Sequence, residues 1–190
     1  MPDPAQPEFA LWRRLRIQLA AWPVSRHLFG SSRRPSVLML LSIVAGAVAG
    51  LLAASLQLGS AHLSTWLTAV PESTFWLPAW LFLPLACAVL TALACAFTHF
   101  VSPESAGSGI PEIEGAMQGV RVVRWVRVLP VKLLGGIAVL GAFLPLGREG
   151  PSVHIGGAVG AMFGSVAKLS RDGRHALLAA GAAGGLAAAH

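Results

Sequence analysis

Charged residues are scarce in this sequence, which argues against an ordinary soluble domain. Asp, Glu, Lys and Arg make up 12% of the 190 residues, whereas hydrophobic residues make up 55%. The charged fraction is about half of that in a typical soluble protein. The 14 basic residues outnumber the 8 acidic ones, but most of them lie in clusters beside long apolar runs. This pattern favours the positive-inside arrangement of a membrane protein over nucleic-acid binding.

Cysteine is also rare, and tyrosine is absent. The two cysteines, Cys87 and Cys95, fall within one apolar run, where we expect small packing residues. Two cysteines cannot form a disulfide framework, and no Cys/His group has the spacing of metal ligands. The sequence contains no P-loop, nucleophile elbow or dinucleotide fingerprint. We therefore expect no metal, no organic cofactor and no enzyme activity.

Long apolar runs predict an all-α, polytopic helical membrane protein. The first two runs are long enough to span a bilayer, and we expect an external link between them up to about residue 74. Gly46 and Gly50 form a small-xxx-small face for close helix packing. The apolar runs cover residues 37–58, 75–101, 129–146, 150–167 and 176–190, the last of which is too short to span.

Residues 1–35 are predicted to be a cytoplasmic tail, and residues 36–190 form the membrane domain. Apolar residues from Leu11 to Trp22 recur at helical spacing, with arginines elsewhere on the wheel, which predicts an amphipathic surface helix. A solvated basic tail is the alternative. Arg33 and Arg34 extend the positive flank, so we place the N-terminus in the cytoplasm. A second positive cluster on the same side comprises Arg121, Arg124, Arg127 and Lys132.

The stretch from Gly147 to Pro151 places Arg148 and Glu149 between two apolar runs. Pro151 suits a first helical turn, where its missing N–H has no partner to lose. A helix that begins here presents free N–H groups and the positive end of its dipole, which predicts an anion site. An ionised Glu149 would occupy that site, and protonation would free it. Simple pairing of Glu149 with Arg148 or another charge is the structural alternative.

A second helix start of the same kind follows Gly107, with Pro111 in the predicted first turn. Glu112 and Glu114 suit the positive end of this short helix, although they could also be an acid/base pair. Short helices that begin within the membrane recur at ion and substrate sites. His154 is expected to be a helix-face residue bonded to a neighbouring carbonyl.

Together these two motifs resemble the ClC family of chloride channels and proton/chloride antiporters, in particular its bacterial members. The Gly/Ala-rich stretch at 178–189 is similar to that family's next segment, so the resemblance runs from about residue 36 to 190. It implies an all-helical fold with an inverted repeat, of which this chain would be the first half, with partial-span helices. It also implies a homodimer in the bacterial inner membrane that contacts lipid and binds no nucleic acid.

The resemblance further implies site roles. Ser108 would donate its hydroxyl to a bound chloride at a central site, as in chloride-preferring members, and Glu149 would be the gating glutamate at an external site. Chloride is the only bound ion expected. The residues that would line its binding site are Gly107, Ser108, Gly109, Ile110, Pro111, Gly147, Arg148, Gly150 and Pro151.

The implied function is proton-coupled chloride antiport. A passive voltage-gated chloride channel of the same fold is the alternative, and a membrane-embedded acid/base enzyme is the alternative of another class.

The family's later Gly-Xaa-Phe-Xaa-Pro motif, pore tyrosine and internal proton glutamate are not in this sequence, and His190 stands where the family usually has phenylalanine. We therefore expect an N-terminal piece of a longer transporter, which would not transport alone. A non-functional gene product is a further possibility.

Overall fold

A computed structural model describes residues 35–73 and 78–190, in which all regular structure is helical. This confirms the all-α prediction; the amphipathic helix predicted at 11–22 lies outside the described residues. The elements are α3 (Pro35–Ser73), α4 (Ala79–Val101), a 3₁₀ turn (Pro103–Ser105), α5 (Ile110–Met117), α6 (Trp125–Gly141), α7 (Glu149–Val166) and α8 (Arg171–Ala187).

The first helix continues well past its predicted end. α3 has 39 residues, so the external link expected after residue 58 is wrong up to Ser73. Hydroxyl side chains in this stretch bond back to the helix, as Ser60 Oγ does to the Gln57 carbonyl and Thr65 Oγ1 does to the Ala61 carbonyl, both at 2.9 Å. These bonds satisfy the hydroxyls within the helix, and polar loop chemistry is therefore not required.

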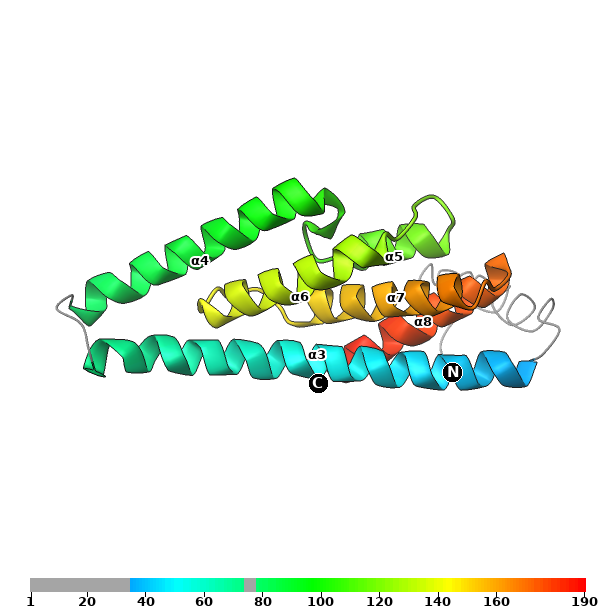
Figure 1. Cartoon of the computed structure of the whole chain (residues 1–190), viewed down its shortest axis with the longest axis horizontal. Helices are drawn as coiled ribbons and strands as arrows, with labels where there is room; N and C mark the ends of the chain where they lie inside the picture. The colour runs from blue at the N-terminus through cyan, green and yellow to red at the C-terminus, as the bar shows by residue number, and fades with distance from the viewer. Residues whose placement is uncertain (1–34, 74–77) are drawn as a thin grey trace, which may run out of the picture.

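The helices lie roughly along one long axis (Figure 1). α3 runs the full length of the molecule, and α4 slants away from it. α6 and α7 lie between them and run in opposite directions, while α8 packs mainly against α7 and α3. α7 begins about midway along α3, because the connection after α6 runs back towards the middle before the next helix starts. The first turn of α7 is therefore held within the helix layer and away from its ends.

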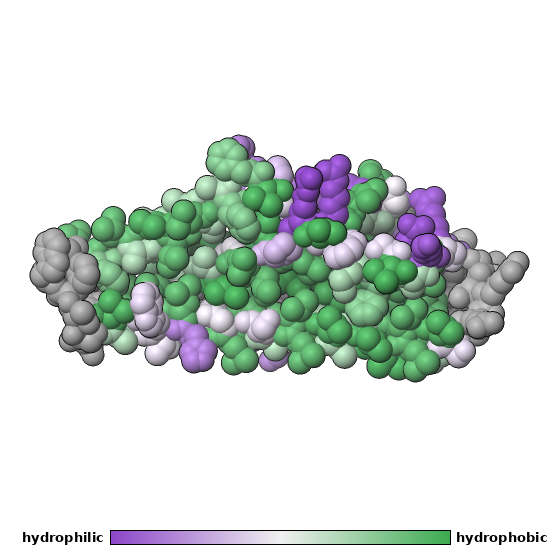
Figure 2. All heavy atoms as spheres, in the orientation of Figure 1, coloured by the Kyte–Doolittle hydropathy of each residue, from purple (hydrophilic) through white to green (hydrophobic). Residues whose placement is uncertain are grey.

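α3 and α4 present apolar side chains that no other described helix covers. Residues 36–70 and 80–101 are each long and apolar enough to cross a membrane. Leu51, Trp80 and Phe100 are 71%, 75% and 82% exposed, respectively. Figure 2 shows a largely hydrophobic face, with hydrophilic side chains gathered at its upper right. An apolar surface of this extent is typical of lipid contact and is rare on soluble monomers.

Glycines bring α7 and α8 into backbone contact. A Cβ built on Gly156 would lie 2.2 Å from the Gly181 carbonyl oxygen, and one on Gly160 would lie 2.1 Å from the Leu177 carbonyl oxygen. α8 also lies close to α3, because a Cβ on Gly184 would lie 2.6 Å from the Gly46 carbonyl oxygen. On α3 itself, Cβ atoms on Gly46 and Gly50 would meet α8 only at the ordinary contact distances of 3.7 Å and 3.8 Å. Close packing of small residues is a principal source of helix association in lipid.

We predict that Gly156→Ala destabilises the protein, because the added methyl group overlaps the α8 backbone, and overpacking of this kind costs about 1–3 kcal/mol. Gly135→Ala is the matched control, since a Cβ there meets only Thr98 Oγ1 at 3.9 Å and alanine favours the helix. Thermal unfolding in detergent should show a midpoint several degrees lower for Gly156→Ala and unchanged or higher for Gly135→Ala. Equal midpoints for the two variants would contradict this packing.

Candidate anion-binding site

The beginnings of α5 and α7 lie against one another. A Cβ built on Gly150 would lie 2.9 Å from the Cβ of Ser108 and 2.9 Å from its carbonyl oxygen. Only glycine therefore allows the first turn of α7 to approach Ser108 this closely, and Gly150 is buried by the contact. The two motifs, which are distant in the sequence, meet at one place.

Two glycines shape the turn that carries Ser108. Gly107 and Gly109 have φ angles of 72° and 83°, in the left-handed region that strains residues with a side chain. Gly109 is the N-cap of α5, Pro111 lies in the first turn as predicted, and no side chain caps this helix end. The first-turn N–H groups thus lack a side-chain partner, and Ser108 is exposed directly before them.

α7 likewise begins without a side-chain cap. Arg148 is its N-cap residue and Glu149 its first residue, within one position of the predicted start. The hydroxyl of Ser152 bonds back to the Arg148 carbonyl at 2.8 Å, so it does not cap the first-turn N–H groups. The positive end of the α7 dipole is therefore directed at the region beside Ser108.

The carboxylate of Glu149 lies at the surface of the chain. Its side chain is 61% exposed, and one oxygen lies 3.6 Å from Nε2 of His190. No described helix covers this side chain, and the apolar surroundings expected from the flanking runs stay a prediction. The contact of Glu149 is with His190, and pairing with Arg148 is not observed.

Glu112 and Glu114 do not form a joint site. Glu112 forms an ion pair with Arg121, which ties α5 to the connection that leads to α6. Glu114 is exposed on the same helix. Because Glu112 is held by an arginine and not shared with Glu114, the acid/base alternative has no support in this geometry.

A buried lysine supports the Ser108 turn, and its role was missed by sequence reasoning. Lys132 is 8% exposed, and its Nζ donates to the carbonyl oxygens of Ser105 at 2.9 Å and Gly107 at 2.5 Å. Its assignment to the cytoplasmic basic cluster is therefore wrong. The sequence did contain an indication of this role. Lys132 lies within the apolar run of α6, and an ionisable residue in such a run is usually functional.

His154 packs beneath the same turn. It is 1% exposed, and a Cβ built on Gly109 would lie 2.2 Å from its Nδ1. Nδ1 has no hydrogen-bond partner among the residues that the structure describes, so the expected bond to a carbonyl is not made by this atom. The imidazole ring instead fills the space that the missing Gly109 side chain leaves.

Residues 88–190 match the family described as voltage gated chloride channel, and this region contains both helix-start motifs. The chain belongs to the voltage-gated chloride channel family. The chain is an integral membrane protein, because it belongs to this family and because α3 and α4 are each long and apolar enough to cross a membrane.

The chain is similar to several proteins that are named as chloride/proton exchangers. It is 46% identical over 171 residues to the H(+)/Cl(-) exchange transporter ClcA of Vibrio cholerae, covering 87% of this chain and 36% of that protein. It is 42% identical to the ClcA of Yersinia pestis, covering 86% and 35%, respectively. A crystal structure of a slow cyanobacterial Cl⁻/H⁺ antiporter matches with a TM-score of 0.75 and 35% identity, over 80% of this chain and 36% of that one. The chain thus spans about a third of the length of these relatives, and its helices share the fold of that antiporter.

We predict that Lys132→Met destabilises this chloride channel family protein, because the buried Ser105 carbonyl oxygen loses its donor, and such a loss costs about 1–3 kcal/mol. Lys168→Met is the matched control, since Lys168 is an exposed lysine between α7 and α8. Thermal unfolding in detergent should show a lower midpoint for Lys132→Met alone. If both variants unfold at the wild-type temperature, Lys132 does not hold the turn.

Proposed function

We propose that this chain provides the anion-binding part of a protein that exchanges chloride for protons across a membrane. The contact between Ser108 and Gly150 carries the proposal, because it brings two uncapped helix beginnings to one place. Helix N-termini attract anions through free N–H groups and the helix dipole. The relatives named as H⁺/Cl⁻ exchangers in the preceding section support the same function.

Chloride suits such a site because it is a small, spherical anion that needs donors but no fixed geometry. In the proposed site, Ser108 contributes its hydroxyl, and the two turns contribute backbone N–H groups. Arg148 adds a positive charge at the start of α7. The lining consists of Gly107, Ser108, Gly109, Ile110, Pro111, Gly147, Arg148, Gly150 and Pro151.

Glu149 is the proposed gate. It is the first residue of α7, so its carboxylate can move between the exposed position and the helix end that binds the anion. An ionised carboxylate competes with chloride there, whereas a protonated one does not. Each passage of chloride would then require the carboxylate to take up and release a proton, which couples the two ions.

We also propose the membrane setting. Arg121, Arg124 and Arg127 lie with the first turn of α8 around one cavity, and the second turn of α8 packs against the start of α3 through Leu177 and Leu38. Basic residues favour the cytoplasmic side, so this end and the N-terminus face the cytoplasm of a bacterium whose inner membrane holds the protein. The complete transporter is proposed to be a homodimer.

We predict that Glu149→Gln abolishes proton coupling, because glutamine cannot carry a proton between the two sides. The assay uses proteoliposomes of the complete transporter, with chloride and proton fluxes measured under a chloride gradient. The wild type should drive protons against their gradient. Glu149→Gln should pass chloride without moving protons, and its chloride flux should lose pH dependence.

Asp172→Asn is the charge-matched control, since Asp172 lies in the first turn of α8 and outside the proposed site, and it should retain coupling. Proton movement that survives in Glu149→Gln would contradict the gate. Chloride current without proton movement in the wild type would indicate a channel. A chloride flux that is the same in wild type and Glu149→Gln at every pH would remove Glu149 from transport and leave an enzymatic role open.

A further inference from the structure

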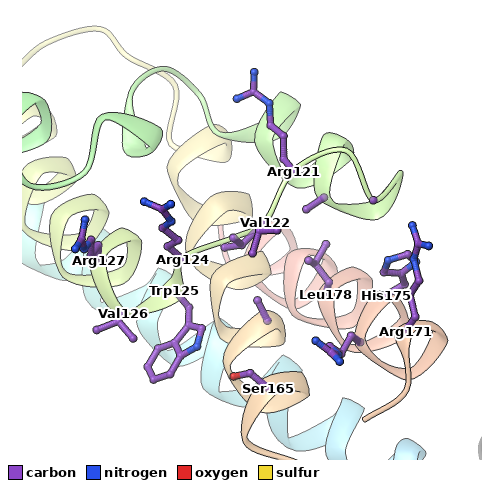
Figure 3. Close-up of a pocket in the computed structure, with 15 residues that line it drawn as sticks. Arg121, Val122, Arg124, Trp125, Val126, Arg127, Ser165, Arg171, His175 and Leu178 are labelled. Atoms are coloured by element: carbon purple, nitrogen blue, oxygen red, sulfur yellow. The ribbon is translucent and has the colours of Figure 1, made fainter. Parts of the chain in front are cut away.

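A cavity of about 930 Å³, here called the arginine cavity, lies between the connection from α5 to α6, the first turn of α6, the end of α7 and the first turns of α8. Its basic lining residues are Arg121, Arg124, Arg127, Arg171, Arg174 and His175, and no lining residue is acidic. Figure 3 shows Arg121, Arg124 and Arg127 coming from one side of the cavity, with Arg171 and His175 from α8 on the other side.

Most of this positive charge is not neutralised within the described part of the chain. Arg121 is paired with Glu112, but Arg124, Arg127, Arg171 and Arg174 form no ion pair with a described carboxylate. Like charges around one cavity repel each other, so the arrangement gains stability when an anion enters. Guanidinium groups form paired hydrogen bonds with phosphate oxygens, which makes phosphate the matching anion.

The two walls of the cavity are held in place by the same arginines. A Cβ built on Gly119 would lie 2.1 Å from a terminal nitrogen of Arg171, so the Arg171 guanidinium lies against the α5–α6 connection. Nε of Arg174 donates to the Leu169 carbonyl at 3.0 Å, which fixes that side chain at the start of α8. The two α8 arginines, Arg171 and Arg174, are therefore positioned before any ligand binds.

Part of the cavity lining is apolar. Val122, Trp125, Val126 and Leu178 belong to it, and Val122 and Val126 are 85% and 63% exposed. A soluble phosphate needs no apolar surface, whereas a lipid places acyl chains directly below its phosphate. Tryptophan is enriched at the level of lipid headgroups, and anionic lipids attract basic residues at the cytoplasmic surface.

We propose that the arginine cavity binds the phosphate of an anionic phospholipid headgroup, with Trp125 and Val126 against the upper part of its acyl chains. This inference does not depend on the proposed transport function, because none of the proposed chloride-site residues lines the cavity. Bound lipid would join the α5–α6 connection to the start of α8 and so stabilise this end of the molecule.

The test is native mass spectrometry of the purified, delipidated chain, with phosphatidylglycerol or phosphatidylcholine added at equal concentrations. The first phosphatidylglycerol should bind about tenfold more tightly than phosphatidylcholine, which corresponds to about 1.4 kcal/mol. The double variant Arg127→Gln/Arg171→Gln should lose this preference, because each wall then lacks one guanidinium group. Lys168→Gln, which removes one charge outside the cavity, should keep the preference.

Two further experiments complete the test. Competition with inorganic phosphate decides the source of the phosphate, and a charge-conserving variant separates a loss of binding from misfolding. Inorganic phosphate should not displace bound phosphatidylglycerol; displacement at millimolar concentrations would overturn the lipid assignment.

The double variant Arg127→Lys/Arg171→Lys keeps the charge but loses the paired hydrogen bonds, so it should show a reduced preference for phosphatidylglycerol over phosphatidylcholine. An undiminished preference in the glutamine variant, or none in the wild type, would refute the proposal. Hydrogen exchange of residues 119–127, in the α5–α6 connection and the first turn of α6, should slow in the wild type with phosphatidylglycerol. An unchanged exchange rate would also count against the proposal.

Discussion

The contact between Ser108 and the glycine at position 150 is the constraint on which the rest of this structure depends. It places the positive ends of two helix dipoles side by side, with no side chain capping either of them. Two positive ends in proximity repel each other, and their free N–H groups are costly away from water. In the proposed site, an anion between the two helix ends would remove both penalties, whether it is a halide or the carboxylate of Glu149.

The surrounding helices hold this unfavourable arrangement in place. α7 cannot retract, because Gly156 and Gly160 fix it against the α8 backbone. The turn that carries Ser108 cannot swing away, because Lys132 holds the carbonyl groups of Ser105 and Gly107 from below. The stability of the close-packed helices thus offsets the local cost at the two helix ends. Glu149 lies at the surface of the chain, where the proposed gating movement would take place.

The helix starts were predictable from the sequence because they depend on local chemistry. A proline shortly after glycine marks a first helical turn, and both starts occur within one residue of their predicted positions. The end of α3 was not predictable in the same way, because hydroxyl groups bonded within the helix look like loop residues in a sequence. The role of Lys132 and the exposure of Glu149 depend on which segments meet in three dimensions, and residue spacing contains little of that information. The contact with Ser108 likewise required the fold, since neither motif alone indicates its partner.

The most direct measurement is anomalous diffraction from crystals of the Glu149→Gln protein grown in bromide, in which the competing carboxylate has lost its charge. The account predicts a bromide peak within hydrogen-bond distance of the Ser108 hydroxyl and of the first-turn N–H groups of α7. Ordered helix ends with no peak between them, or bromide found only in the arginine cavity, would contradict it.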